Sequence, residues 1–176
     1  LYGVSKLAAH YLIKNYREMY GLYACSGIMF NHESPRRSNK FVTQKIIKGL
    51  KSGKCFSIGN LESRRDWGHA QDFVEAMWVA LQQDKADDYV ISTGTSYSVR
   101  DFIEIAVKIM GKEIMWSGEK ENEIGMIDGE VVIKVSKEFY RPYTTGLLVG
   151  DPSKIESLGW KRKFDLHGLI EDMIKG

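Results

Sequence analysis

Apolar residues along the chain recur in two kinds of pattern, and each kind predicts a different element. Repeats of three or four positions predict amphipathic helices, and they occur in the segments 2–20, 41–50, 73–81, 99–109 and 166–174. Short uninterrupted apolar runs predict strands, and they occur at 22–30, 55–58, 88–93, 114–116 and 131–135. The stretch between the last two runs is rich in Glu and Gly, and we expect a polar linker there.

Single residues indicate where several of the predicted helices begin or end. Gly21 follows the first helix as its C-cap, and Ser98 with Asp101 forms a capping box at the start of the fourth. We expect Asp72 to cap the third helix, a structural role that we prefer to a catalytic one. Asp151 and the proline after it predict the start of a further short helix.

The order of the elements indicates an α/β protein. The first helix is followed by the run 22–30, which has no polar alternation and is typical of a strand buried on both faces. A helix followed by such a strand is the repeating unit of a parallel α/β sheet. We therefore expect a parallel sheet flanked by helices.

Composition restricts the classes of protein that this chain fits. A length of 176 residues, with 43% apolar and 27% charged residues, suits one soluble globular domain. The net charge of +2 gives no electrostatic reason to expect binding to nucleic acid or to an anionic membrane. No apolar run reaches the roughly 18 residues of a membrane span, and we expect no signal peptide. The chain lacks an initiating Met and begins inside a predicted helix, so we expect a fragment or a processed piece.

The two cysteines, Cys25 and Cys55, lie in apolar runs that are typical of buried strands. Their separation does not match the ligand spacing of a zinc site, and we predict no metal site. Free thiols in a reducing, cytoplasmic setting are the simpler interpretation of these two residues.

Candidate chemistry begins with Tyr2 and Lys6, which are four residues apart and so share one face of the first helix. A free tyrosine hydroxyl has a pKa of about 10 and is a poor base at neutral pH. A nearby ammonium group favours the phenolate, which would allow Tyr2 to take a proton from an alcohol while hydride leaves the same carbon. By itself this spacing is weak evidence, because a half-buried tyrosine beside a solvated lysine is common in helices.

Two dense polar segments follow predicted strands. The segment 31–37, with one histidine and two arginines, comes directly after the first strand, and ligands of open α/β sheets bind beyond the carboxyl ends of the strands. Arginine presents a planar fork of donors that suits phosphate groups. The segment is therefore a candidate phosphate site, with a solvated loop as the alternative. The second segment, 64–72, is also polar and contains a tryptophan.

Seven short motifs occur in order along nearly the whole chain. They are Tyr2-Gly3-Val4-Ser5-Lys6, Phe30-Asn31-His32-Glu33-Ser34-Pro35-Arg36-Arg37, Phe41-Val42-Thr43, Arg65-Asp66-Trp67-Gly68-His69-Ala70, Glu121-Asn122-Glu123, Tyr140-Arg141-Pro142 and Gly150-Asp151. In this order and at these separations they resemble the GDP-mannose 4,6-dehydratase family of the extended short-chain dehydrogenase/reductases.

The resemblance implies a lyase with tightly bound NADP that converts GDP-mannose to GDP-4-keto-6-deoxy-mannose, a precursor of GDP-fucose. Hydride would pass from C4 of the mannose to the nicotinamide, water would be eliminated across C5 and C6, and the hydride would return to C6. The resemblance makes Tyr2 the base and gives Lys6 the nicotinamide ribose. His32 and Arg37 match cofactor-contacting positions, so the implied cofactor residues are Tyr2, Lys6, His32 and Arg37.

The candidates for the nucleotide-sugar site share positions near these motifs. They are Asn31, Val42, Thr43, Lys45, Arg65 and Arg141. By resemblance the arginines face the diphosphate, while Val42 and Thr43 line the site through backbone and packing.

The sequence departs from the family pattern in two places. The glycine-rich dinucleotide loop and the catalytic Thr and Glu of the family's first half are not in this sequence, and the segment 143–146 replaces a Glu and an Asp.

The resemblance also implies a division of the chain. Residues 1–30 and 72–95 would be the remainder of a Rossmann-type NADP-binding domain with a parallel sheet. Residues 31–71 and 96–176 would form a smaller α/β lobe that binds the GDP-sugar. The helix that carries Tyr2 commonly packs against its own copy in this superfamily, so we expect a homodimer or a homotetramer.

Two alternatives to this interpretation remain open. One is a related extended short-chain reductase, or a dehydratase of another nucleotide-sugar, and the segments 31–37 and 65–69 favour the dehydratase of GDP-mannose over it. The other is a truncated, non-catalytic piece that binds a nucleotide-sugar or pairs with full-length subunits. The missing cofactor loop is the observation that supports this second alternative.

Overall fold

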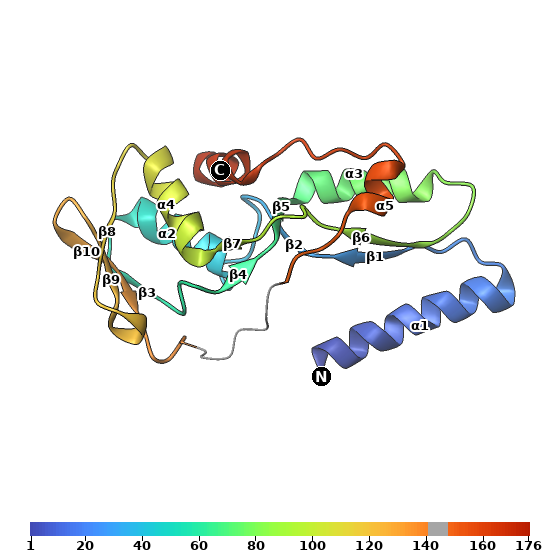
Figure 1. The fold of residues 1–176 in the computed structure, drawn as a ribbon, viewed down its shortest axis with the longest axis horizontal. Helices are drawn as coiled ribbons and strands as arrows, with labels where there is room; N and C mark the ends of the chain where they lie inside the picture. The colour runs from blue at the N-terminus through green and yellow to red at the C-terminus, as the bar shows by residue number, and fades with distance from the viewer. Residues whose placement is uncertain (141–147) are drawn as a thin grey trace.

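The computed structural model describes residues 1–140 and 148–176 of the chain. It has a small parallel sheet covered by two helices, and a larger lobe in which three helices pack on a second sheet (Figure 1). Two further pairs of short strands connect these parts. The predicted α/β class is confirmed.

The small sheet pairs β1 (Ser26–Met29) in parallel with β6 (Asp88–Ile91). Helix α3 (Ala70–Leu81) and the short helix α5 (Ser153–Ser157) lie on one side of it in Figure 1, and α1 (Tyr2–Tyr20) lies on the other. The core between this sheet and the helices α3 and α5 consists of the side chains of Phe73, Ala76, Ala80, Tyr89, Ile91, Ile155 and Trp160.

The prediction of a strand buried on both faces at 22–30 was wrong for this chain. The strand has four residues, and Ile28 and Met29 are both exposed. Within the described residues, β1 pairs along one edge only, with β6. A short apolar run without polar alternation indicates what a strand can bury, and the neighbours in space decide what it does bury.

The larger lobe is built around a four-stranded mixed sheet with the order β3-β10-β9-β8. Its strands are β3 (Phe56–Ile58), β8 (Met115–Ser117), β9 (Ile124–Ile127) and β10 (Glu130–Val135). The three helices α2 (Val42–Ser52), α4 (Val99–Ile109) and α6 (Leu166–Lys175) share its core, to which each contributes fully buried side chains such as Ile46, Phe102 and Leu169.

The expectation of a polar linker before β10 was wrong, because β9 occupies part of that stretch. A short 3-10 turn (Lys120–Asn122) precedes β9, and a tight turn at Asp128 and Gly129 joins it to β10. Both turn residues have positive φ, 54° and 81°, as a two-residue hairpin turn requires. The Asp-Gly pair was the local signal that could have revealed this hairpin.

The two polar segments 31–37 and 64–72, the first of which was interpreted as a loop, both contain short strands. Residues Asn31–Glu33 form β2, which pairs in parallel with β5 (Trp67–His69). Residues Arg64–Arg65 form β4, which pairs antiparallel with β7 (Tyr97–Ser98). Pairs this short depend on partners that are distant along the chain, so the local polarity of each segment did not reveal them.

The capping box is confirmed, and the expected cap at Asp72 is wrong. Ser98 Oγ accepts from the backbone N–H of Asp101 at 3.0 Å, and Asp101 accepts in return at 2.8 Å. Helix α3 instead begins at Ala70, and the ring of His69 caps it by accepting from a backbone N–H. Asp72, in the first turn, accepts from two backbone N–H groups of the segment 163–164, so its role is structural but tertiary.

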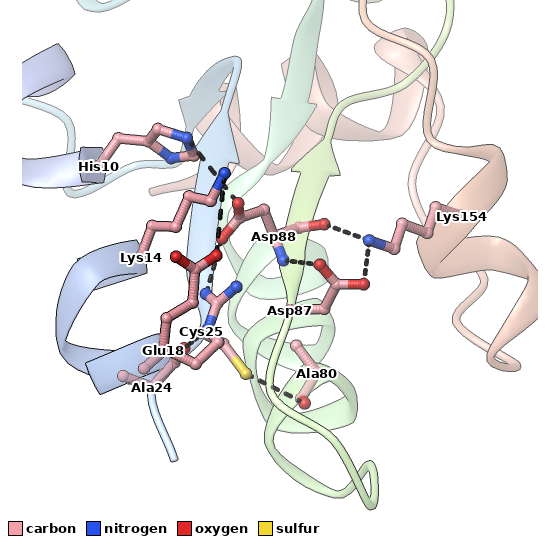
Figure 2. Close-up of polar contacts among 10 residues, drawn as sticks. His10, Lys14, Glu18, Ala24, Cys25, Ala80, Asp87, Asp88 and Lys154 are labelled. Carbon is pink, nitrogen blue, oxygen red and sulfur yellow. Dashed lines mark hydrogen bonds and ion pairs between the residues drawn. The ribbon is translucent and has the colours of Figure 1, made fainter. Parts of the chain in front are cut away.

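Helix α1 is tethered at its C-terminal half and has no buried residue. Gly21 ends it with a φ of 62°, as expected of its C-cap. Arg17 then donates to the carboxylate of Asp88 at 2.7 Å and to the carbonyl of Ala24 at 2.9 Å. Figure 2 shows Asp88 between α1 and Lys154 of α5. The ammonium of Lys154 holds the pKa of the neighbouring residue, Asp87, below its ordinary value.

The two cysteine thiols are free, as expected. Their predicted burial was wrong, since Cys55 is exposed and Cys25 is half-buried. Cys55 precedes β3 rather than lying inside it. Among the helices of residues 1–140 and 148–176, none combines the length and the apolar character needed to cross a membrane.

Candidate functional site

The predicted catalytic pair lies on the first two turns of α1. The ammonium nitrogen of Lys6 is 5.5 Å from the centre of the Tyr2 ring, so the two side chains share a face as expected. Tyr2 is 77% exposed. Helix α1 runs away from this end and β1 returns to it, so the first turn of α1 and the carboxyl end of β1 lie at the same end of the small sheet (Figure 1).

His32 lies in β2, a short distance beyond the carboxyl end of β1. Its Nδ1 is 2.9 Å from the carbonyl oxygen of Phe30, and because a carbonyl only accepts, Nδ1 must carry the proton. The ring also stacks on Phe73 of α3, with 5.1 Å between the centroids. These contacts orient the ring and leave Nε2 as its remaining polar atom.

Arg37, the second predicted cofactor residue, lies in the loop between β2 and α2. Its guanidinium carbon is 3.5 Å from the centre of the Phe41 ring, and its Nε is 3.1 Å from a carboxylate oxygen of Glu33. Nε is not aimed for a hydrogen bond to that oxygen, so the contact is an ion pair. Among the described residues, the other guanidinium donors of Arg37 have no hydrogen-bond partner, so they can serve another anion.

The first turn of α2 carries three of the predicted nucleotide-sugar residues. Val42 is half-buried against the core of the larger lobe. Thr43 is fully buried, and its hydroxyl donates to Glu33 at 2.6 Å. That side chain is therefore already engaged, and only its backbone remains for a ligand. The ammonium of Lys45 is 4.0 Å from the centre of the Phe139 ring.

The two arginines of β4 differ in how they are engaged. Arg64 donates to the carbonyl of Ser96 at 2.6 Å and to its hydroxyl at 3.2 Å, and it lies 3.7 Å from Asp101. Arg65 donates to the carbonyl of Arg64 at 2.6 Å, its one side-chain hydrogen bond among the described residues. Arg65 therefore has more guanidinium donors without a partner among the described residues than Arg64 has.

Asp66 is a structural centre of this region that the sequence did not reveal. It is fully buried and accepts from the N–H and the hydroxyl of Thr93 at 2.8 and 2.7 Å. It also accepts from the N–H of Gly94 at 3.1 Å and from that of Gly150 at 3.3 Å. A Cβ at Gly150 would lie only 2.4 Å from the side chain of Ser92, so the close approach of this segment requires glycine.

A cavity of about 310 Å³ opens beside Tyr140 in the larger lobe. Arg100 lines it and is held by Glu62 at 2.7 Å and by Glu123 at 2.8 Å. The two carboxylates raise the pKa of Arg100 above its ordinary value, Glu123 contributing most. The side chain of Arg100 is therefore held in place where it lines this cavity.

The remaining predicted residue of the nucleotide-sugar site, Arg141, lies outside the described residues.

Strand register brings most of the other predicted residues together. Asn31 is paired with Trp67, two residues after Arg65, and His32 is paired with Gly68. Residues Asn31, His32, Arg37, Thr43 and Arg65 thus belong to one connected region around β2, β5 and the start of α2. Tyr2 and Lys6 lie apart from this region, on α1 (Figure 1). The roles assigned to all these residues stay predictions.

Comparison with known proteins gives a consistent result. The family described as "GDP-mannose 4,6 dehydratase" matches residues 1–173 of the chain. A curated relative of that name from Cricetulus griseus is 45% identical over 182 residues, which cover 99% of this chain and 49% of that protein. The chain thus spans about half the length of the curated relatives that it matches.

Solved structures show a similar fold. RMD from Pseudomonas aeruginosa, complexed with NADPH, has a TM-score of 0.77 at 21% identity, covering 99% of this chain and 55% of that one. The dTDP-glucose 4,6-dehydratase of Bacillus anthracis, in complex with NAD, has a TM-score of 0.73 at 17% identity, covering 99% and 50%. At such identities the likeness establishes the fold, and the predicted Rossmann-type class is confirmed.

Proposed function

This chain belongs to the GDP-mannose 4,6-dehydratase family, and we propose from that premise that it supplies the catalytic-tyrosine and substrate-binding half of such an enzyme. The complete enzyme would convert GDP-mannose to GDP-4-keto-6-deoxy-mannose. The observation that carries the proposal is the family match over residues 1–173. The shared face of Tyr2 and Lys6 supports it independently.

A nicotinamide cofactor is part of the proposal, and we favour NADP over NAD. The residues present suit such a group, because Arg37 is held by Glu33 and Phe41 in a way that leaves guanidinium donors for a phosphate. His32 is oriented by its contact with Phe30. When bound beside Tyr2 and Lys6, the nicotinamide would supply reversible hydride-transfer chemistry between C4 and C6 of the sugar.

The residues of this chain would bind and orient the substrate and move one proton. Tyr2 takes the proton of the mannose 4-hydroxyl, and Lys6 holds the nicotinamide ribose beside it. Arg65 faces the diphosphate, with Lys45 and the backbone of α2 along the nucleotide. We assign the acid–base step at C5 and C6 to no residue of this chain, and the described environment of Glu33 is closed by Thr43 and Arg37.

The proposed division into a cofactor part and a substrate part stays a prediction. The segment 151–160, which we placed with the substrate part, packs through Ile155 and Trp160 against α3 and β6.

A homodimer or homotetramer also stays a proposal, supported by the exposed apolar side chains along α1. A cytoplasmic location is proposed from the free thiols of the two cysteines.

The proposal is tested by incubating the purified complete enzyme with GDP-mannose and following the products by NMR. Appearance of GDP-4-keto-6-deoxy-mannose is the expected result, and an epimer or a reduced sugar would replace the proposal with a related activity. An intact-mass spectrum should accompany the assay. A mass about twice the 20.1 kDa of this chain is expected of the active form, because the relatives are about twice as long.

Arg65→Ala in the complete enzyme should weaken GDP-mannose binding about 10- to 100-fold, the loss expected for hydrogen bonds to a charged group. Binding of NADP should change little, and calorimetry with each ligand measures both. Arg64→Ala is the matched control, because its guanidinium is engaged by Ser96 and Asp101. Equal loss of both ligands in Arg65→Ala would indicate a packing role instead.

A further inference from the structure

Glu33 is a buried carboxylate that the proposed mechanism does not use. It ends β2, is 2% exposed, and has one oxygen, Oε2, in contact with two partners. The hydroxyl of Thr43 donates to that oxygen at 2.6 Å, and Nε of Arg37 lies 3.1 Å from it. One carboxylate oxygen thus touches a predicted cofactor residue and a predicted substrate residue at once.

The loop around Glu33 is folded tightly onto the start of α2. The backbone N–H of Arg37 donates to the carbonyl of Ser34 at 2.9 Å, and that of Phe41 donates to Ser38 at 3.1 Å. The side-chain amide of Gln44 donates to the carbonyl of Pro35 at 3.4 Å. Because these turns are short, a shift of Glu33 moves both Arg37 and the first turn of α2.

Stability alone does not account for a carboxylate at this position. Burial raises the pKa of Glu33, against the opposing effects of the Thr43 hydroxyl and the Arg37 charge. A raised pKa means that the charged form is less favourable in the folded chain than in the unfolded chain, so ionised Glu33 lowers stability at neutral pH. A buried ion pair is therefore weak evidence for a stabilising role.

We propose that Glu33 is a positioning residue that sets Arg37 for the cofactor and the first turn of α2 for the nucleotide-sugar. Both contacts are made by the same oxygen, so the position of Glu33 couples the loop that carries Arg37 to the first turn of α2. The inference rests on the proposed function for the identity of the ligands. The inference adds Glu33 to the residues that affect binding, and its effect on both ligands is indirect.

The test uses Glu33→Gln in the complete enzyme, with dissociation constants for NADP and for GDP-mannose measured by calorimetry. Glutamine keeps the shape of the side chain and can still accept from Thr43, but it loses the charge that holds Arg37. We expect the dissociation constant for NADP to rise about 10-fold, the loss of one charge-assisted contact to Arg37, while that for GDP-mannose changes little because the contact with Thr43 is kept. The thermal midpoint should stay equal or rise, because the cost of the buried charge is removed.

Two variants of α2 separate positioning from general damage. Thr43→Val removes only the contact between Glu33 and the helix, so GDP-mannose binding should weaken about 5-fold while NADP binding is retained. Thr43→Ser keeps the hydroxyl and should lie closer to the wild type. Gln44→Met is the matched control, because Gln44 is buried in the same turn and its side-chain amide donates to Pro35 rather than to Glu33.

The outcomes distinguish this inference from the proposed function. A wild type that binds neither ligand overturns both. A wild type that binds both, with Glu33→Gln unchanged in both constants, overturns the positioning role alone. The positioning role also fails if the losses in Glu33→Gln and Gln44→Met are equal and accompany an equal fall in the thermal midpoint, since that pattern is a folding defect.

Discussion

Replacing Tyr2 with phenylalanine in the complete enzyme should lower kcat about 10²- to 10⁴-fold, the range of a lost general base. Binding of GDP-mannose should be nearly unchanged, because the ring and its contact with Lys6 remain in place. Only the hydroxyl that takes the proton of the mannose 4-hydroxyl is removed. Turnover is measured by NMR detection of the keto sugar, and binding by calorimetry.

Tyr20→Phe makes the same chemical change at the other end of α1. Its ring lies about 27 Å along the helix axis from that of Tyr2 and is equally exposed to solvent in the chain. We expect wild-type turnover from this variant. If Tyr2→Phe retains wild-type turnover as well, Tyr2 has no part in the mechanism and the assignment of the base fails.

Asp66→Ala should produce the largest loss of stability of any substitution considered for this chain, about 3–5 kcal/mol in the free energy of unfolding. Three backbone N–H groups, from Thr93, Gly94 and Gly150, lose their acceptor, and those of Thr93 and Gly150 belong to buried residues. Buried donors without partners are costly because water cannot replace the lost bond. Urea denaturation followed by circular dichroism measures the change.

Asp66→Asn should fall between Asp66→Ala and the wild type, because its amide keeps one acceptor oxygen and presents an N–H₂ group to the remaining donors. Glu171→Ala is the control. Glu171 is exposed on α6 and pairs with Lys175 one turn away, and the urea midpoint of this variant should match the wild type. An Asp66→Ala midpoint equal to that control would show that Asp66 does not hold these segments together.

The helices were largely predictable from the sequence because their information is local. The periodicity over 2–20 and 99–109 matches α1 and α4, and the capping box of Ser98 and Asp101 lies where its spacing placed it. An i to i+4 geometry also puts Tyr2 and Lys6 on one face without any tertiary contact. The family, too, follows from motif order, which needs no coordinates.

The short strands were not predictable in the same way. β2 pairs with β5 from 36 positions further along the chain, as Asn31 opposes Trp67, and nothing in a polar segment of three residues specifies such a partner. The start of α3 was misplaced for a related reason. Asp72 is of a residue type preferred at N-caps and His69 is not, yet the carboxylate of Asp72 is engaged by the segment 163–164 and His69 caps the helix.

The sequence by itself determined the helices, the α/β class and the set of candidate site residues, because periodicity, capping and motif spacing act over a few residues or in fixed order. Only the tertiary structure decided which of those side chains are free to act. In the folded chain the Thr43 hydroxyl is engaged by Glu33, and Asp66 is bonded to Gly150, 84 positions away. The guanidinium of Arg65 makes fewer hydrogen bonds than that of Arg64. Such contacts depend on which distant segments pack together, and that is set by burial of the whole chain rather than by any local pattern.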